Sequence, residues 1–539
     1  MQSNTRKQIF MPFIFALLVA LGVFIGRNFM AGPSGGGNNP LMIYPQASNK
    51  LDGIMTLIED EYVDTVNRQS IEERIIPEIL KDLDPHSVYI PAKDLNKVNE
   101  ELQGNFGGIG VQFSMQNDTV MVIQVIQGGP SEKVGILPGD RIVAVNDSII
   151  AGKSIATTDV MKQLRGEMGT DVKVGVLRRP NKDLIDFNIT RGNIPIYSVE
   201  VSYMVNETTG YIKVDKFAQN TYQEFLTALA KLKANNCQEL IIDFRGNSGG
   251  LLDVAIRLCN EFLPAKDLIV YTEGKAHKRQ NVHANGAGTC QDTKVIVLID
   301  EFSASASEIF AGAIQDNDRG VVIGRRSFGK GLVQQQIPLS DGSALRLTIA
   351  RYHTPSGRCI QKSYENGSSD YYEDIYNRYA QGEFFNQDSI EFNDSLKYTT
   401  KNGRTVYGGG GIMPDVFVAR DTSMMTDYFY KLRVNGIIYR YALQYTDNNR
   451  ASMEQFTSAE SIGAYLDKEN ILAGFLNFAK DKGVSFNQKD YNLSKELIEI
   501  ELKAYIARNL IDNEGFYPML HQVDEVFKEA VEEALKTES

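Results

Sequence analysis

The sequence predicts a multidomain α/β protein with helical regions at both ends. A chain of 539 residues exceeds one ordinary domain, and three or four domains are expected. Short β-like runs separated by glycine turns begin at Gly104, and two later segments read as a buried strand, a loop of small residues and a helix. Apolar residues recur at helical spacing before and after these segments.

Composition narrows the function classes. With 42% hydrophobic and 23% charged residues, the chain has the balance of a globular protein. The net charge of -12 argues against a general nucleic-acid binder, although a local basic patch stays open. Zinc is not expected, because no C-x-x-C pair occurs, and the sequence does not specify a disulfide pairing among the four cysteines, Cys237, Cys259, Cys290 and Cys359.

The N-terminus predicts a membrane anchor. Arg6 and Lys7 precede an apolar run over residues 9–26, and Arg27 follows it. Eighteen residues are about enough for a helix to cross a bilayer core. No A-x-A cleavage site follows, so a retained anchor is favoured over a cleaved signal peptide, with the bulk of the chain exported. The stretch GPSGGGNN then reads as a flexible linker.

A helical region precedes the first β-rich segment. Apolar residues recur at helical spacing in two runs, Leu51, Ile54, Met55 and Ile58, and Ile71, Ile75 and Ile79. Pro85 and Pro91 in LDPHSVYIPAKDL predict a turn and an extended connector. We interpret His86 as a turn histidine hydrogen-bonded locally rather than as a catalytic group.

The β-rich segment resembles a PDZ domain over residues 95–185. Its short strands alternate with glycine turns and with short helices around 131–134 and 158–164, and it contains LPGDRIVAVND and GGIGV. The resemblance implies that a bound peptide adds as a strand, with its C-terminal carboxylate held by backbone N–H groups at Gly108, Ile109, Gly110 and Val111. Simple hairpin turns are the alternative for these glycines.

A strand, a glycine loop and a helix follow in CQELIIDFRGNSGGLLDVAIRLCNEFL, residues 237–263. Residues 240–244 predict a buried strand, and residues 251–258 have helical spacing. A glycine loop before a helix offers clustered N–H donors to an anion. The phosphate-binding signatures G-x-x-x-x-G-K-[ST] and G-x-G-x-x-G are absent, and an oxyanion hole is the other use of such donors.

The same pattern recurs in KVIVLIDEFSASASEIFAGAIQDND, where three serines stand at a strand-to-helix corner. Ser305 and Glu308 match S-x-x-E, so a capping box is the structural interpretation of Ser305. The corner also exposes a serine beside helix N–H donors, which favours negative charge on its oxygen. A nucleophilic serine needs a base, and none of the five histidines stands in a recognisable triad motif.

A lysine whose pKa is lowered by burial can serve as that base. Lys330, in GRRSFGKGLVQ, stands between glycines and apolar residues. If it lies on a strand, Gln334 projects from the same face. This reasoning alone leaves the choice of base open.

Four motifs, DFRGNSGG, SASASEIFAGAIQD, GRRSFGKGLVQ and TPSGRCIQ, occur in this order after the PDZ-like segment. Together they resemble the carboxy-terminal processing (tail-specific) serine proteases of peptidase family S41, over residues 45–420. The resemblance implies a ClpP/crotonase-like α/β core with an inserted PDZ domain, a partly open β-barrel with helices. It also implies a Ser305–Lys330 dyad supported by Gln334.

The resemblance further implies that neutral Lys330 takes the proton of Ser305 and that an acyl-enzyme forms and is hydrolysed. Backbone N–H groups of Ala306, Gly249 and Gly250 are the expected oxyanion donors. We expect Asp316 to be structural, and Ser303 and Ser307 to cap and pack. No metal or organic cofactor is implied.

The resemblance and the composition together predict five regions. We expect residues 364–407 to be a surface elaboration whose tyrosines contact substrate only as the less favoured alternative. Helical stripes in the last region, such as Val523, Val526, Phe527, Ala530 and Ala534 or Ile498, Leu502, Tyr505 and Ile506, are expected either to pack on the core or to mediate homodimerisation. The regions are 1–31, the anchor or signal sequence; 32–94, linker and N-terminal helices; 95–185, PDZ; 186–420, protease core with the insertion; and 421–539, C-terminal helices.

These expectations combine into a membrane-anchored endopeptidase on the periplasmic side of the inner membrane. Its PDZ domain would capture proteins with exposed apolar C-termini, Arg165 is a candidate gating residue, and an activating adaptor is a candidate partner. Nucleic acid is not an expected partner. The main alternative is a catalytically inactive, membrane-tethered PDZ scaffold, and acyl-CoA chemistry on the crotonase-like fold is the other.

Overall fold

The computed structural model describes residues 49–116, 118–126, 128–178 and 183–536, and the chain divides into two compact units, residues 1–74 and 75–539. The first unit contains α2, Lys50–Glu61, and the beginning of α3, Arg68–Lys81, which confirms both helices expected there. Within it, the Arg68 guanidinium pairs with Asp52, Glu59 and Glu72.

The apolar run over residues 9–26 lies outside the described residues, and no helix within them is long and apolar enough to cross a membrane.

The second unit holds an antiparallel sheet in the PDZ-like segment. Its strand order is β3-β4-β5-β7-β8, and β6 pairs with β5. Both predicted short helices form, as α5 and α6. The bounds are α4 Ala92–Gln103, β2 Asn105–Gly108, β3 Val111–Gln116, β4 Thr119–Val125, α5 Pro130–Val134, β5 Arg141–Val145, β6 Ser148–Ile149, α6 Thr157–Leu164, β7 Asp171–Leu177, β8 Leu184–Thr190 and β9 Gly192–Pro195.

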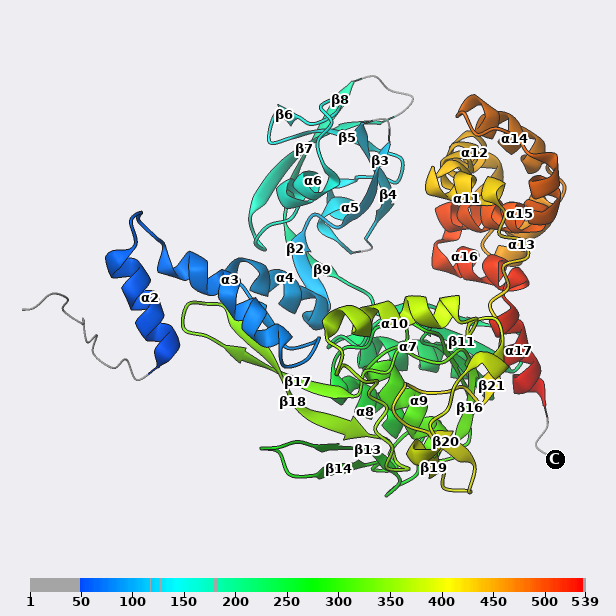
Figure 1. The fold of residues 1–539 in the computed structure, drawn as a ribbon. Coiled ribbons are helices and arrows are strands. Elements are labelled where there is room, and N and C mark those ends of the chain that lie inside the picture. The colour runs from blue at the N-terminus through cyan, green and yellow to red at the C-terminus, as the bar shows by residue number, and fades with distance from the viewer. Residues whose placement is uncertain (1–48, 117, 127, 179–182, 537–539) are drawn as a thin grey trace, which may run out of the picture. The chain divides into compact units, whose positions relative to one another are not determined.

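The largest core surrounds a six-stranded sheet in the order β10-β11-β12-β15-β16-β21, parallel except for the antiparallel pair β10–β11. Alternate residues of the buried strands face opposite sides, so Val295 and Val297 pack with α7, α8 and α9 while Ile296 and Leu298 pack with α17 (Figure 1). The bounds are β10 Val199–Met204, β11 Thr209–Val214, α7 Thr221–Ala234, β12 Glu239–Asp243, α8 Leu252–Asn260, β15 Lys294–Ile299, α9 Ala306–Asp316, β16 Gly320–Gly324, β21 Val416–Phe417 and α17 Glu525–Leu535.

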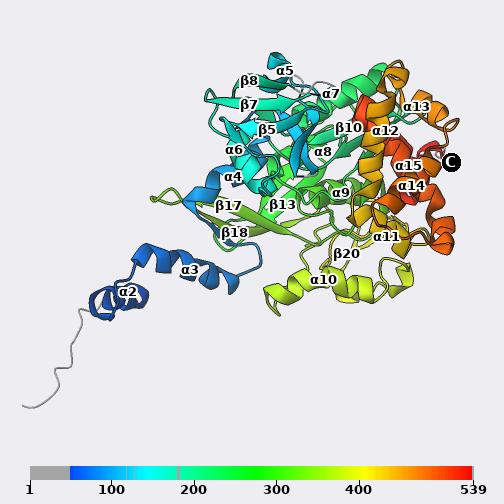
Figure 2. The ribbon, with the colours of Figure 1, turned by 90° about the horizontal axis from the view of Figure 1, so that it is seen from above.

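A second sheet supplies the hairpin that follows the glycine–lysine motif. It has the order β1-β18-β13-β14, with β17 paired to β18. Residues 364–407 contain α10, which lies at the periphery of the core in Figure 2, two short 3₁₀ helices and a small hairpin. The bounds are β1 Val88–Ile90, β13 Leu268–Glu273, β14 Gln280–His283, β17 Leu332–Pro338, β18 Ala344–His353, α10 Ser368–Ala380, η1 Gln387–Ser389, η2 Asp394–Leu396, β19 Lys397–Thr399 and β20 Thr405–Tyr407.

The C-terminal helices use their apolar stripes inside the chain. Val526, Phe527, Ala530 and Ala534 of α17 cover the second face of the six-stranded sheet, while Ile498 and Leu502 pack in a separate cluster. Packing within the chain is therefore the role observed for both stripes. The bounds are α11 Asp427–Val434, α12 Ile437–Met453, α13 Ala459–Leu466, α14 Ile471–Asp481, α15 Gln488–Ile511, α16 Asn513–Leu520 and η3 His521–Val523.

Candidate active site

Three loops meet at the carboxyl edge of the six-stranded sheet. They follow the neighbouring parallel strands β12, β15 and β16, so the glycine loop, the serine corner and the glycine–lysine loop emerge side by side. The carboxyl ends of parallel strands are the usual place for a site in open α/β sheets. The sheet topology therefore brings together the three motifs that the sequence separates.

Ser305 occupies a strained position at the start of α9. Its φ of 57° and ψ of -111° are unusual for a residue with a side chain, and such strain persists only where the surroundings enforce it. Gly249 packs directly against this corner. A Cβ at position 249 would lie 2.7 Å from the Ser305 Cβ, so a glycine is needed for the two segments to approach this closely. The Ser305 N–H donates to Glu308 Oε2 at 2.7 Å, so the Glu308 half of the expected capping box is present.

Glu308 joins the serine corner to the glycine–lysine loop, a role that sequence reasoning missed. Besides the Ser305 N–H, its buried carboxylate accepts from Ser327 Oγ at 2.5 Å, Gly329 N–H at 2.8 Å and Lys330 N–H at 2.9 Å. Burial raises the pKa of Glu308, while these donors lower it. The S-x-x-E pattern marked the residue as a cap but held no signal of its distant partners.

Tyr352 on β18 makes a second bridge between the same two segments. Its hydroxyl lies 3.1 Å from the Ser305 carbonyl oxygen and 2.8 Å from the Lys330 carbonyl oxygen. The main chains of Ser305 and Lys330 are thus held by two shared side chains, Glu308 and Tyr352.

The Lys330 ammonium is mostly buried beside Gln334. Burial, followed by the nearby Arg346 cation, lowers the pKa of Lys330, which favours the neutral amine. Lys330 Nζ donates to Gln334 Oε1 at 3.2 Å. Within the described residues, no hydrogen bond joins Lys330 Nζ to the Ser305 hydroxyl; here the lysine is paired with the glutamine.

Lys330 does not lie on a strand, which was the condition for Gln334 to project from the same face, although Gln334 still reaches it. β17 begins only at Leu332, and its register with β18 shifts between Val333 and Gln334. The residue skipped in this register, Ile349, lies on β18, and alternation along β17 does not extend to Lys330 because Lys330 lies outside the strand. The other end of the Gln334 amide, Nε2, donates to the main-chain oxygen of His86.

His86 is hydrogen-bonded locally, as expected, but through its main chain, whereas its ring contacts a distant residue. Locally, Asp84 Oδ1 accepts from the His86 N–H at 2.8 Å, but the ring Nε2 lies 2.9 Å from the hydroxyl of Tyr371 on α10. Burial, with the nearby charge of Lys330, lowers the pKa of His86 to about 4, so the ring is neutral near pH 7. The sequence carried no signal for a partner 285 positions away.

The glycine loop is pinned to the serine corner. Ala304 N–H and Ser307 Oγ both donate to the Asn247 carbonyl oxygen, at 3.0 Å each. The Gly249 N–H donates to Asn247 Oδ1 at 2.9 Å, so this predicted oxyanion donor is already used. Among the hydrogen bonds of the described residues, none uses the N–H groups of Gly250 or Ala306, the two remaining expected donors.

Buried polar contacts surround the corner. Ser303 Oγ donates to the Phe244 carbonyl oxygen at 2.9 Å. Asp316 accepts from Arg358 Nη2 at 2.7 Å and from Ser356 Oγ at 2.7 Å, with the Arg358 and Asp316 side chains fully buried. These contacts fit the packing roles expected for Ser303, Ser307 and Asp316.

The insertion is more than the surface elaboration expected from its polar composition. Tyr371 is only 2% exposed and packs edge-on against Phe328 of the glycine–lysine loop. Arg378 donates to the carbonyl oxygens of Arg326 and Ser327, at 2.7 and 3.0 Å. Periodicity does not reveal these contacts, because one face of α10 is exposed while its buried face carries tyrosine and arginine.

The predicted peptide-binding residues lie between β2 and β3. Gly108 ends β2, Gly110 has a φ of 78°, Val111 begins β3, and the Ile109 side chain is buried in the core of this region. Arg165 follows α6; its guanidinium lies 3.9 Å from the centre of the Phe106 ring and 3.6 Å from Glu100 on α4. Arg165 is thus placed where the PDZ-like region meets α4.

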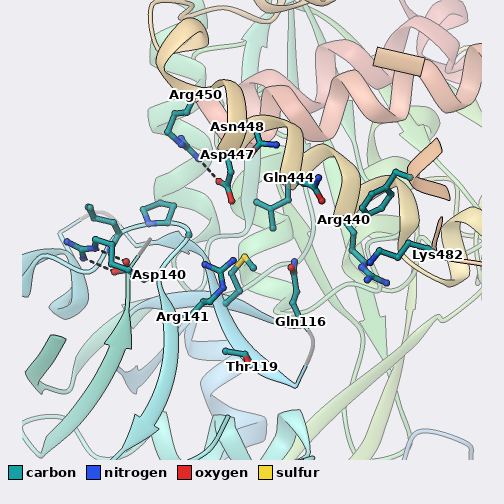
Figure 3. A pocket seen from close by; sticks show the side chains of 17 residues that line it. Gln116, Thr119, Asp140, Arg141, Arg440, Gln444, Asp447, Asn448, Arg450 and Lys482 are labelled. Atoms are coloured by element: carbon teal, nitrogen blue, oxygen red, sulfur yellow. Dashed lines mark hydrogen bonds and ion pairs between the residues drawn. The ribbon is translucent and has the colours of Figure 1, made fainter. Parts of the chain in front are cut away.

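A cavity of about 1030 Å³ lies elsewhere, between the PDZ-like strands and α12 (Figure 3). Its lining includes Arg141, Arg178, Arg440, Arg450 and Lys482. Arg178 pairs with Asp140 at 2.7 Å and Arg450 with Asp447 at 3.9 Å. None of the predicted catalytic side chains lines this cavity, so its size does not make it the candidate active site.

Comparison with known proteins gives three family matches and several relatives. Residues 208–367 match peptidase family S41, residues 107–190 a PDZ domain, and residues 428–512 a family of unknown function (DUF8443).

Among curated relatives, the chain is 36% identical over 331 residues to a carboxy-terminal-processing protease of Bartonella bacilliformis, covering 60% of this chain and 74% of that protein. It is 33% identical over 322 residues to the carboxy-terminal processing protease CtpB of Bacillus subtilis, covering 59% and 66%. A solved photosystem II D1 C-terminal processing protease is 25% identical, with a TM-score of 0.37, covering 68% of this chain and 86% of that one.

Proposed function

The chain belongs to the carboxy-terminal-processing proteases of peptidase family S41, and on that premise we propose that Ser305 is its nucleophile and Lys330 its general base. The observation that carries this assignment is that Glu308 and Tyr352 each hydrogen-bond to the main chains of both Ser305 and Lys330, which fixes the two residues relative to each other. Family membership favours a protease over the inactive scaffold and over acyl-CoA chemistry.

In the proposed reaction, neutral Lys330 accepts the proton of the Ser305 hydroxyl as the oxygen attacks a peptide carbonyl. The N–H groups of Ala306 and Gly250 then donate to the oxyanion. The amine leaves with a proton returned by Lys330, and water hydrolyses the acyl-enzyme with Lys330 again as base. Catalytic hydrogen bonds often tighten only with substrate bound, so the pairing of Lys330 with Gln334 is compatible with this sequence of steps.

The test is cleavage of an unfolded protein with an apolar C-terminus by the full chain in detergent. Ser305→Ala and Lys330→Ala are each expected to lower kcat by at least about 10³-fold, since nucleophile and base act as a unit. Ser340→Ala and Lys93→Ala, at exposed positions, are the matched controls and should retain activity. Undiminished cleavage by Ser305→Ala would refute the assignment.

We also propose that the PDZ domain recognises the C-terminal tail of substrates through residues 108–111. Support comes from the family match and from the placement of this loop between β2 and β3, where a peptide could add as a strand. A tail peptide with a free carboxylate should bind more tightly than its amidated form. Equal affinity for the two peptides would count against carboxylate recognition.

For location, we propose a membrane-anchored protein with its protease exported. The support is the sequence alone: Arg6 and Lys7, the apolar run over 9–26 and Arg27. Membrane fractionation and accessibility of the protease region to an externally added protease would test it. Recovery in the soluble fraction, or protection of the protease region behind an intact inner membrane, would refute it.

A further inference from the structure

The insertion helix α10 contacts residues 84–87, called the connector below, through two tyrosine hydroxyls. The Tyr371 hydroxyl lies 2.9 Å from His86 Nε2, and the Tyr372 hydroxyl donates to the Pro85 carbonyl oxygen at 2.9 Å. The Tyr371 and His86 rings also meet edge-on, 5.2 Å between centroids. Two consecutive residues of α10 therefore hold two consecutive residues of the connector.

The connector is in turn fixed over the β17–β18 hairpin. Asp84 Oδ1 accepts from Thr348 Oγ1 at 3.1 Å, and the Thr348 N–H donates to Ser87 Oγ at 3.1 Å. Thr348 is the register partner of Gln334 on the neighbouring strand. This arrangement aims the His86 carbonyl oxygen at the Gln334 amide, whose other end accepts from Lys330 Nζ.

The hydrogen-bond directions form one consistent chain. Gln361 Oε1 accepts from the Gly331 N–H at 2.7 Å, so the Gln361 amide nitrogen faces the Tyr371 hydroxyl oxygen at 3.3 Å and donates to it. The Tyr371 proton is then free to be donated to His86 Nε2, which requires the neutral ring. Gln361 also links Tyr371 to the residue that follows Lys330.

We propose that Tyr371, in the insertion, is a positioning residue for the catalytic lysine, acting through His86 and Gln334. The inference rests on the proposed function of Lys330. It gives residues 364–407 a role in the reaction: the insertion sets where the Lys330 amine stands, without itself touching the reacting atoms.

The test is a double-mutant cycle between Tyr371→Phe and Gln334→Ala, measured as kcat and KM for cleavage of one unfolded substrate by the full chain. Tyr371→Phe removes one hydroxyl and keeps the ring. It should lower kcat about tenfold, since small displacements of a catalytic group are costly, with KM changed less than about twofold. In the Gln334→Ala background the same substitution should have almost no further effect.

The control is Tyr376→Phe, which removes a hydroxyl from the 72% exposed tyrosine of the same helix and should leave kcat unchanged. Thermal unfolding of each variant reports whether the fold is intact. Should Tyr371→Phe unfold, His86→Leu breaks the same contact from the connector side and takes its place in the cycle.

Equal loss of kcat in the wild-type and Gln334→Ala backgrounds would overturn the proposal, as would unchanged kcat in Tyr371→Phe. A parallel Ser305→Ala sample separates this inference from the proposed function. Cleavage surviving in Ser305→Ala refutes the dyad itself, whereas an inactive Ser305→Ala with an additive cycle refutes only the role of Tyr371.

Discussion

The serine half and the lysine half of the candidate site are held in different ways. Ser305 stands between a buried strand and a buried helix, and its contacts come from Glu308, three residues on, from the neighbouring glycine loop and from Tyr352 on β18. Lys330 stands in a loop, and its amine is paired with Gln334, four residues on, which is held in turn by the connector and α10, from two distant parts of the chain. The nucleophile is thus held by its own helix turn and by two neighbouring segments of the same core, whereas the base depends in addition on the connector and on the insertion.

The largest expected effect tests the chemistry of the lysine half. Lys330→Arg keeps the positive charge and much of the stem, but a guanidinium does not lose its proton in proteins. We expect kcat to fall by at least about 10³-fold, as for loss of the base. Steady-state cleavage measures this, with folding checked by thermal unfolding. Substantial activity in Lys330→Arg would mean that the lysine is an electrostatic group and that the base lies elsewhere.

The next effect tests how local the serine half is. Gly249→Ala places a Cβ 2.7 Å from the Ser305 Cβ at a φ of 103°, so the corner must shift. We expect kcat to fall about 10²-fold, with the free energy of unfolding lowered by about 1–3 kcal/mol. Gly246→Ala is the control: this glycine also has a positive φ, 74°, but an added Cβ meets nothing within 4 Å. Similar kcat losses in both variants would implicate backbone strain rather than the contact with Ser305.

A smaller effect concerns the pH dependence of the lysine half. A general base must be neutral, so activity rises with pH through the pKa of Lys330, and a lowered pKa extends activity toward lower pH. Arg346→Met removes a cation that lowers this pKa, so the rising limb of the kcat profile should move to higher pH. At a pH on that limb, the rate should fall about two- to threefold.

Arg351→Met, at an exposed position on the same strand, is the control for that profile. If the rising limb of the kcat profile does not move in Arg346→Met, or moves equally in both variants, the limb does not report the pKa of Lys330.

The smallest effect lies outside both halves, at Arg165. Its pair with Glu100 is partly exposed, and replacing it by alanine should change the free energy of unfolding by no more than about 1 kcal/mol. If Arg165 takes part in gating, Arg165→Ala should alter kcat/KM for a substrate with a free apolar tail and leave cleavage of an amidated one unchanged. Equal changes for both substrates would assign Arg165 to packing alone.

The sequence alone supported much of the serine half. Periodicity located β12, β15, α8 and the start of α9, and the S-x-x-E pattern predicted the contact between Ser305 and Glu308. These features depend on residues within a few positions of one another, where spacing translates directly into geometry. The family resemblance, rather than spacing, selected Lys330 and Gln334.

Only the tertiary structure decided how the base is held. The register of Gln334 depends on pairing with Thr348 of β18, the carbonyl facing Gln334 belongs to the connector, and the hydroxyl facing His86 belongs to the insertion. Each contact joins residues far apart in the chain, and each forms only after the sheets and α10 have packed. A hydrogen bond between residues far apart in the chain imposes no periodic pattern on a single sequence. The serine corner could therefore be predicted, while the surroundings of the lysine could not.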